Sequence, residues 1–276
     1  MKAAVLGSPI AHSLSPVLHR AGYAALGLTD WTYTAIECAE SGLAALLASC
    51  DDDWAGLSLT MPLKRAVLPL LDTIEPLAAD VGGVNTVVFD HGQRRGYNTD
   101  VPGMVSALAE AGVAAPKSAI ILGAGATACS ALAALRAVGL STVTVAVRDP
   151  ARAASLLPVA ARLDVRVDLQ TLTEAGDTAP DLLISTVPAG AADFLAGQLG
   201  AGHPAPATVF DVVYAPWPTR LAQAAQQSGA TVVGGLDLLL HQAAGQFELM
   251  TGVRPAPVDA MRSAGQAELA RRSAPV

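Results

Sequence analysis

At residues 120–128 the chain reads IILGAGATA. The apolar residues at the start of this stretch favour a β-strand, the glycines favour a tight turn, and the Ala- and Leu-rich residues beyond Ala128 favour a helix. A strand that passes through a glycine-rich turn into a helix is typical of sites that bind a dinucleotide pyrophosphate. Gly123 permits the turn, Gly125 lets backbone amides approach the pyrophosphate, and Ala128 allows the helix to pack closely on its strand. This half of the chain is therefore predicted to bind a nucleotide.

Short β-type runs alternate with helical stretches on both sides of this turn. From the turn strand onward six runs fit a doubly wound, Rossmann-like sheet, near 118–122, 142–147, 165–169, 181–186, 208–213 and 230–233. The first hundred residues contain four more, at 2–6, 31–36, 56–60 and 84–89, with helical stretches at 16–26 and 41–48. A helical stretch at about 102–111 joins the two sets, and the pattern after residue 235 is wholly helical, over about 237–251 and 257–271. The predicted class is α/β.

These patterns predict two domains and a returning tail, in agreement with a length of 276 residues at roughly 150 residues per domain. Residues 1–102 are expected to form an α/β substrate-binding domain, and residues 103–234 the dinucleotide-binding domain. The C-terminal helices at 235–276 are expected to pack back on the substrate domain.

Composition excludes several classes of protein. Hydrophobic residues make up 52%, charged residues 15%, and mean hydropathy is +0.43, which favours a globular chain over a disordered one. The net charge of −7 and the pI of about 5.1 oppose binding to nucleic acid or to anionic lipid. The apolar run at 236–240 is far shorter than the ~20 residues of a membrane span, and the N-terminus reaches Gly7 too soon for a signal peptide.

Cysteine and histidine spacing gives no sign of a metal site. The three cysteines, Cys38, Cys50 and Cys129, are odd in number and widely separated, so we expect three reduced thiols in the core and a cytoplasmic location. The five histidines show no metal-ligand spacing. We expect no metal, a small-molecule substrate, and a monomer or homodimer.

Lys64 and Asp100 are the candidate catalytic residues. Each stands in a turn-rich segment that ends a β-type run, GLSLTMPLK at residues 56–64 and GYNTD at residues 96–100. An ammonium and a carboxylate that converge on one polar cleft indicate proton transfer. Beside a nicotinamide cofactor, such a pair predicts interconversion of a carbonyl and an alcohol.

The residues after the second strand of the nucleotide domain bear on the choice of cofactor. Arg148 stands about where the ribose 2′ position is recognised, with Arg152 one helical turn later, and two guanidinium groups suit the 2′-phosphate of NADP. Asp149 between them could instead accept hydrogen bonds from the free hydroxyl of NAD and repel a phosphate. NADP is therefore the predicted cofactor, with NAD as the alternative.

Hydroxyl and amide side chains stand at the ends of predicted elements, which suits a small polyhydroxylated acid as substrate. Several have a structural alternative: Ser15 before Pro16 could cap a helix, and Tyr214 could be a core aromatic residue. The whole set is Ser13, Ser15, Thr60, Asn85, Thr86, Asn98, Thr99, Tyr214 and Gln242.

Several blocks together resemble the shikimate dehydrogenase family, in order and along nearly the whole chain. They are GSPIAHSLSP at 7–16, TMPLK at 60–64, GVNT at 83–86, NTDVPG at 98–103, DVVYAP at 211–216, and Gly235 with Gln242. The resemblance implies reversible, NADPH-dependent reduction of 3-dehydroshikimate to shikimate, a reaction of aromatic amino-acid biosynthesis.

The resemblance also implies a role for each matching residue. Lys64 and Asp100 would flank the reacting carbon. Ser13 and Ser15 would bind the substrate carboxylate, and the ring hydroxyls would be held by Thr60, Asn85, Tyr214 and Gln242. The cofactor would be bound by Gly123, Gly125, Ala126, Arg148, Arg152, Val213 and Gly235.

The chain departs from the family pattern along the expected cofactor cleft. Asp149 stands where a threonine commonly follows the arginine, and Val187 where a threonine commonly precedes Pro188. Ser58 replaces a common asparagine on the substrate side. Two alternatives stay open: an NAD-preferring quinate/shikimate dehydrogenase, and a ligand-sensing module that binds shikimate-like acids without converting them.

Overall fold

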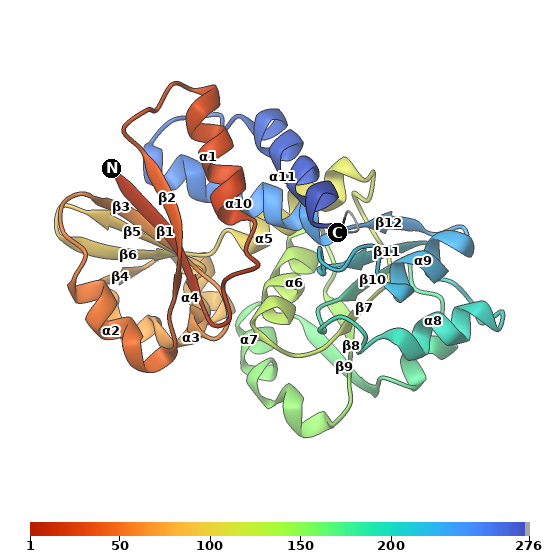
Figure 1. The fold of residues 1–276 in the computed structure, drawn as a ribbon. Coiled ribbons are helices and arrows are strands. Elements are labelled where there is room, and N and C mark those ends of the chain that lie inside the picture. The colour runs from red at the N-terminus through yellow and green to blue at the C-terminus, as the bar shows by residue number, and fades with distance from the viewer. Residues whose placement is uncertain (274–276) are drawn as a thin grey trace. The chain divides into compact units, whose positions relative to one another are not determined.

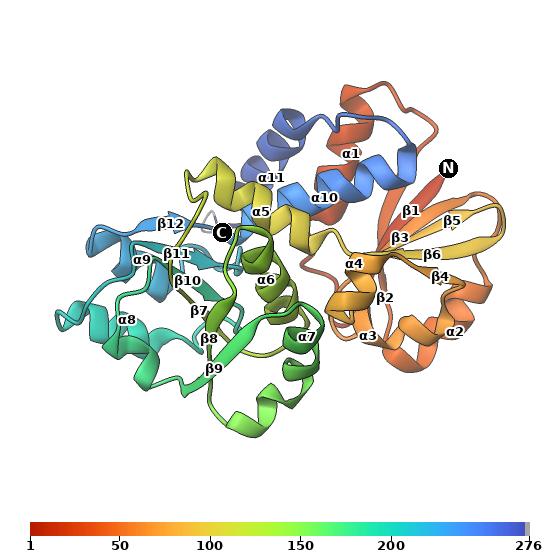
Figure 2. The same ribbon diagram turned by 180° about the vertical axis from the view of Figure 1, so that it is seen from behind.

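The computed structural model describes residues 1–273, except for the side chain of Arg152. The chain divides into two compact units. Unit 1 comprises Met1–Thr99 together with the chain from Leu239 onward, and unit 2 comprises Asp100–Leu238. Each unit has a six-stranded sheet of its own, covered by helices (Figures 1 and 2). The predicted α/β class, with C-terminal helices that return to the first part of the chain, is confirmed.

The sheet of unit 1 is mixed and has the strand order β2-β1-β3-β5-β6-β4. Its strands are β1 (Lys2–Gly7), β2 (Thr32–Glu37), β3 (Trp54–Leu59), β4 (Thr73–Ile74), β5 (Thr86–Asp90) and β6 (Gln93–Tyr97). β1 pairs in parallel with β2 and β3, whereas β5 runs antiparallel to β3 and to β6. The sequence pattern does not predict β4 or β6. β6 lacks apolar alternation because two arginines interrupt it, and it forms through its hairpin with β5.

Two cores lie on the two faces of this sheet. Side chains of successive β1 residues point to opposite faces, so Ala3 and Val5 join one core and Ala4 and Leu6 the other. In Figures 1 and 2, α1, α10 and α11 lie on the first face and α2, α3 and α4 on the second. These helices are α1 (Ser15–Ala25), α2 (Glu40–Ala48), α3 (Leu63–Ala66), α4 (Pro76–Val81), α10 (Gly235–Thr251) and α11 (Val258–Ser273).

Unit 2 has a wholly parallel sheet in the order β12-β11-β10-β7-β8-β9. The six predicted strands are confirmed as β7 (Ala119–Leu122), β8 (Thr142–Val147), β9 (Arg166–Thr171), β10 (Leu182–Ser185), β11 (Thr208–Asp211) and β12 (Thr231–Val233). The helices are α5 (Asp100–Glu110), α6 (Ala126–Ala137), α7 (Leu157–Arg162), α8 (Asp193–Gly200) and α9 (Arg220–Gln227), with short 3₁₀ helices η2 (Pro150–Ser155) and η3 (Glu174–Asp177). β7 has β8 on one side and β10 on the other, so the strand order reverses there. Ligands of such sheets bind beyond the carboxyl ends of the strands at this reversal.

The three cysteines are free. Cys38 and Cys129 are buried, as expected for core thiols, but Cys50 is only half-buried because it follows α2 at the edge of its core. Within residues 1–273 no helix is both long enough and apolar enough to span a bilayer.

Candidate functional site

One edge of the unit 1 sheet collects the candidate substrate residues of that unit. The carboxyl ends of β1 and β3 share this edge because the two strands are parallel. β5 is antiparallel to β3, so it begins at the same edge, and β6, antiparallel to β5, ends there. The segments that follow β1, β3 and β6 and precede β5 carry Ser13, Ser15, Thr60, Lys64, Asn85, Asn98 and Thr99. Asp100 is the next residue of the chain and opens α5 in unit 2.

Lys64 lies in the short helix α3, which follows β3 after a turn of three residues. Its side chain is half-buried, and its carbonyl oxygen accepts a hydrogen bond from the Val84 N–H at 2.9 Å. The Leu59 N–H donates to the carbonyl oxygen of Asn85 at 2.7 Å. These bonds tie the backbone around Lys64 to the backbone around Asn85. The lysine therefore stands on a helical turn just after β3, within the turn-rich segment that the sequence pattern indicates.

The side chain of Asn85 is buried and held in one orientation. Its Oδ1 accepts hydrogen bonds from the Thr99 N–H at 2.8 Å and from the Thr86 hydroxyl at 2.9 Å. Its Nδ2 donates to Thr99 Oγ1 at 2.9 Å and to Gln242 Oε1 at 3.4 Å. Asn85 and Gln242, two predicted ligands of ring hydroxyls, are thus brought together. Asn98 instead donates to the Gly83 carbonyl at 2.8 Å, which is a structural role.

A buried series of hydrogen bonds from Tyr33 through Ser58 and Gln246 reaches the backbone of Asn85. The sequence pattern predicts no role for Tyr33 or Gln246. The Tyr33 hydroxyl donates to Ser58 Oγ at 2.6 Å, and Ser58 Oγ donates to Gln246 Oε1 at 2.8 Å. Gln246 Nε2 then donates to the Asn85 carbonyl oxygen at 3.2 Å. Burial raises the pKa of Tyr33, so its hydroxyl remains a donor. The signal that could have found Gln246 is its spacing of four residues from Gln242 on one helix face.

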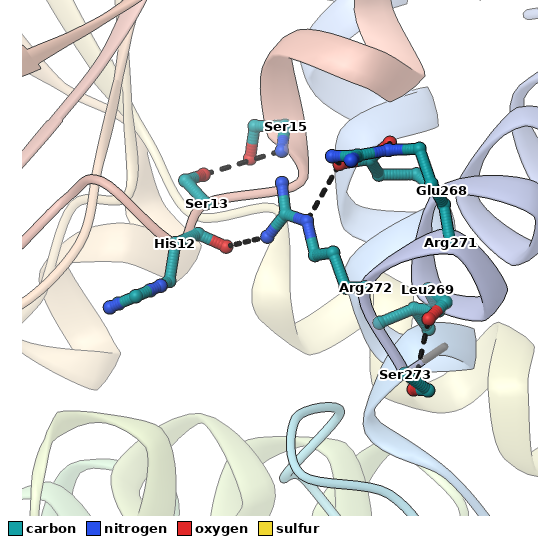
Figure 3. Close-up of polar contacts among 8 residues, drawn as sticks. All are labelled: His12, Ser13, Ser15, Glu268, Leu269, Arg271, Arg272 and Ser273. Carbon is teal, nitrogen blue, oxygen red and sulfur yellow. Dashed lines mark hydrogen bonds and ion pairs between the residues drawn. The ribbon is translucent and has the colours of Figure 1, made fainter. Parts of the chain in front are cut away.

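Ser13 and Ser15 lie at the start of α1 (Figure 3). The N-cap residue of α1 is Leu14, and no side chain caps the helix there. Ser15 is the first helical residue, so the alternative that it serves as the helix cap is wrong. Instead, the Ser15 N–H donates to Ser13 Oγ at 3.3 Å. Ser15 is buried and Ser13 half-buried, and the His12 imidazole points away from both (Figure 3).

In unit 2 the glycine turn follows β7 directly. Gly123 has φ of +101°, and a Cβ there would lie 2.8 Å from Thr186 Oγ1, so both backbone and space require glycine. Gly125 has φ of −77°, and a Cβ on it would meet no heavy atom within 4 Å. The chain itself therefore does not require glycine at 125. Gly125 is the N-cap of α6, Ala126 is its first residue, and Ala128 is buried.

Arg148 and Asp149 follow β8, and both are exposed. The Asp149 carboxylate accepts a hydrogen bond from the Ala151 N–H at 3.0 Å and so caps the 3₁₀ helix η2. The side chain of Arg152 lies outside the described part of the chain.

The segment after β11 lies beside the start of α10. Asp211 accepts hydrogen bonds from the Thr219 hydroxyl at 2.7 Å and from the Val213 N–H at 3.3 Å. Burial raises the pKa of Asp211, and these hydrogen bonds act against that rise. A Cβ on Gly235 would lie 2.6 Å from the carbonyl carbon of Val213, so the two backbones pass in close contact. Tyr214 is half-buried, so it is not the core aromatic residue of the structural alternative.

Within residues 1–273 no three His, Cys, Asp or Glu side chains are grouped so that they could hold a metal ion. The site offers hydrogen-bonding and charged groups.

Two family models and a relative that match this chain are described as shikimate dehydrogenases. A family model described as the shikimate dehydrogenase substrate binding domain matches residues 5–87, and one described as the shikimate 5'-dehydrogenase C-terminal domain matches residues 235–264. A relative from Thermus thermophilus named shikimate dehydrogenase (NADP(+)) is 38% identical over 99% of this chain and 98% of its own.

Two solved structures show the same likeness. The shikimate dehydrogenase of Mycobacterium tuberculosis has a TM-score of 0.87 and 42% identity, covering 97% of this chain and 99% of that one. The Thermus thermophilus enzyme in complex with NADP(H) and shikimate has a TM-score of 0.85 and 34% identity, with coverage of 97% and 99%.

Proposed function

Because the chain belongs to the shikimate dehydrogenase family, we propose that it catalyses the reversible, NADPH-dependent reduction of 3-dehydroshikimate to shikimate. The observation that carries this conclusion is similarity along almost the entire chain to enzymes named NADP-dependent shikimate dehydrogenases. A solved relative of the same fold holds both NADP(H) and shikimate. The enzyme is an oxidoreductase that acts on a secondary alcohol and uses NADP.

We propose that Lys64 and Asp100 are its catalytic residues. When bound, NADPH would supply the hydride for the ketone carbon of the substrate. Lys64 gives a proton to the oxygen as it becomes an alkoxide, and Asp100 orients the substrate hydroxyl and the ammonium group. An ammonium beside a forming oxyanion both stabilises the charge and transfers the proton. The proposal is supported by the position of Lys64 on a short helix at the sheet edge where the hydroxyl and amide side chains gather.

The substrate carboxylate and hydroxyls are proposed to bind to residues from several segments. Ser13 and Ser15 are assigned to the carboxylate. The ring hydroxyls are assigned to Thr60, Asn85, Gln242 and Tyr214. Support comes from the hydrogen bond between Asn85 and Gln242, which places two amide side chains side by side in unit 1. The buried chain from Tyr33 to Gln246 would hold Asn85 rigid during turnover.

The cofactor is proposed to lie along the glycine turn of unit 2. The open space beside Gly125 fits a pyrophosphate that approaches the amides at the start of α6. Arg148 offers an exposed guanidinium to the 2′-phosphate. The full set is Gly123, Gly125, Ala126, Arg148, Arg152, Val213 and Gly235.

Substitution of the two turn glycines should separate folding from cofactor binding. In Gly125→Ala the new methyl group meets no atom of the chain but occupies the space for the pyrophosphate. We expect the melting temperature to be unchanged and the KM for NADP to rise about tenfold or more, which corresponds to roughly 1.4 kcal/mol of binding energy. Gly123→Ala is the matched control, because its positive φ and its contact with Thr186 should lower stability by about 1–2 kcal/mol. An unchanged KM for NADP in Gly125→Ala would contradict the cofactor position.

Asp149 is the residue that favours the NAD alternative, and its carboxylate already caps η2. Asp149→Asn keeps an acceptor for the Ala151 N–H and removes the charge. We expect the ratio of kcat/KM for NADP to that for NAD to change by less than about threefold, because an exposed charge is strongly screened by solvent. Asp149→Ala, which loses the cap, should lower stability by about 0.5–1 kcal/mol. A tenfold or larger shift toward NADP in Asp149→Asn would show instead that Asp149 selects the cofactor.

A single assay tests the proposed function. Initial rates of NADPH or NADH formation are measured with shikimate and with quinate, each with NADP and with NAD. We expect the highest kcat/KM for shikimate with NADP. Preference for NAD and quinate would support the quinate/shikimate alternative, and saturable shikimate binding without turnover would support the ligand-sensing alternative.

We also infer a cytoplasmic location. Support comes from Cys38, Cys50 and Cys129, which are all free, as is usual in a reducing compartment.

A further inference from the structure

The segment that carries the two serines is held at both of its ends. At its start, the Glu37 carboxylate accepts hydrogen bonds from the Ser8 hydroxyl at 2.6 Å and from the Ile10 N–H at 3.0 Å. At its end, Arg272 of α11 donates from Nη1 to the carbonyl oxygen of His12 at 2.8 Å. These two residues are 260 positions apart in the chain, so only the return of α11 to unit 1 brings them together.

The bond from Arg272 fixes the peptide group that joins His12 to Ser13. The carbonyl of this group accepts from Arg272, and its N–H donates to the Ile10 carbonyl oxygen at 3.0 Å. Because a peptide group is planar, holding both polar atoms sets the direction in which the chain enters Ser13. Ser13 Oγ in turn accepts from the Ser15 N–H, so the orientation passes on to the second serine (Figure 3).

Glu268 holds the guanidinium of Arg272 in place. Arg272 Nε donates to Glu268 Oε1 at 2.7 Å, and Arg271 donates to both oxygens of the same carboxylate at 2.8 Å. The two guanidinium groups lower the pKa of Glu268 to about 2, so the carboxylate stays charged. Figure 3 shows Arg272 between Glu268 and the His12 carbonyl, whereas the guanidinium of Arg271 overlaps the Glu268 carboxylate to which it donates.

We propose that Arg272 is a positioning residue for the substrate carboxylate: fixed by Glu268, it orients the segment from His12 to Ser15 so that both serines face the carboxylate. The inference rests on the proposed function, because it assumes that Ser13 and Ser15 bind that group. The planar guanidinium of Arg272 donates to Glu268 through Nε and to the His12 carbonyl through Nη1, so the two bonds fix its orientation.

The chain offers a matched control for this proposal. Arg271→Ala, like Arg272→Ala, removes one positive charge beside the Glu268 carboxylate, but it leaves the bond from Arg272 to His12 in place. The pair of variants therefore separates the effect of orienting the His12 segment from the effect of positive charge. Initial rates are measured with the full chain, varied shikimate and saturating NADP, for the parent, Arg272→Ala, Arg272→Lys, Arg271→Ala and Ser13→Ala. Thermal melting is followed for each variant.

We expect Arg272→Ala to raise the KM for shikimate roughly three- to tenfold with kcat within about twofold, the size of one partly exposed hydrogen bond. Arg272→Lys should recover part of this loss, and Arg271→Ala should change neither constant by more than about twofold. With the methyl ester of shikimate, which lacks the carboxylate charge, the difference between Arg272→Ala and the parent should largely disappear.

The outcomes separate this inference from the function on which it rests. A parent without shikimate turnover, or Ser13→Ala with an unchanged KM, would overturn the function or the serine assignment, and the inference with it. A raised KM in Ser13→Ala together with an unchanged KM in Arg272→Ala would overturn the inference alone. Equal increases in Arg272→Ala and Arg271→Ala would also overturn it, since charge rather than orientation would then be the cause.

Discussion

Lys64→Ala is expected to lower kcat for shikimate oxidation by about 10²–10⁴-fold, the range of a positioned acid or base. The loss should fall mainly on kcat, because the proton is transferred in the transition state, whereas the assigned serines and amides keep the substrate bound. Rates are followed by NADPH absorbance under saturating shikimate and NADP. The melting temperature should stay close to that of the parent, since the side chain of Lys64 is only half-buried.

Two further variants make this test decisive. Arg65→Ala removes a neighbouring, exposed positive charge from the same short helix, and we expect kcat within about twofold of the parent. Asp100→Asn keeps the shape of the side chain and removes its charge, and kcat should fall strongly. Turnover within a few-fold of the parent in both Lys64→Ala and Asp100→Asn would show that the catalytic assignment is wrong.

The second large effect is on stability at acidic pH and comes from His19. This residue is fully buried in unit 1, stacked on the Tyr33 ring at 4.0 Å between centroids, with an angle of 11° between the planes. Within the described part of the chain, neither ring nitrogen has a hydrogen-bonding partner. Burial lowers the pKa of His19 to about 3, and the Gln246 side chain acts in the opposite direction.

The direction of the pH effect follows from which state binds the proton. Below pH 6.5 an unfolded chain protonates this histidine, whereas the folded chain keeps it neutral until about pH 3. Falling pH therefore favours unfolding across this interval, by at most about 1.4 kcal/mol per pH unit for one proton. Between pH 6.5 and 5 the free energy of unfolding should decrease by up to roughly 2 kcal/mol.

Urea denaturation at pH 7, 6 and 5 measures this decrease. His19→Phe, which keeps a ring to stack on Tyr33 and cannot take up a proton, should show a much flatter dependence on pH. His12→Gln removes an exposed histidine of the same unit and should retain the slope of the parent. The comparison is between the slopes of unfolding free energy against pH. The cost of repacking around Phe is the same at every pH, so it does not affect these slopes. Equal slopes for His19→Phe and the parent would contradict a neutral, buried His19.

The sequence resemblance was sufficient for the family, and the family models and relatives confirm it. The periodicity of apolar residues was sufficient for the α/β class and for all six strands of unit 2. Parallel strands buried on both faces produce nearly continuous apolar runs, so their signal is strong. The roles of the individual site residues stay predictions, which the variants above are designed to test.

The fold of unit 1 was harder to predict where pairing with a neighbouring strand, rather than the apolar pattern of the segment itself, decides the structure. β6 shows no strand pattern because Arg94 and Arg95 interrupt it. The strand forms through its hairpin with β5, and its two arginines make ion pairs with Asp72, Glu75 and Asp90. Ser15 looked like a helix cap because it precedes Pro16. The N-cap residue is Leu14, one position earlier, and no side chain makes a capping hydrogen bond there.

The sequence by itself determined the family and the fold class, and it predicted the site residues, since glycines at a turn, a lysine, a carboxylate and paired serines are local features of fixed spacing. Only the tertiary structure decided which groups hold those features in place. The support of Asn85 by Gln246 and the contact of Arg272 with His12 join residues that are 161 and 260 positions apart in the chain. The physical reason is that such contacts depend on how strands pair and on where α10 and α11 return, and local patterns of residues carry no information about either.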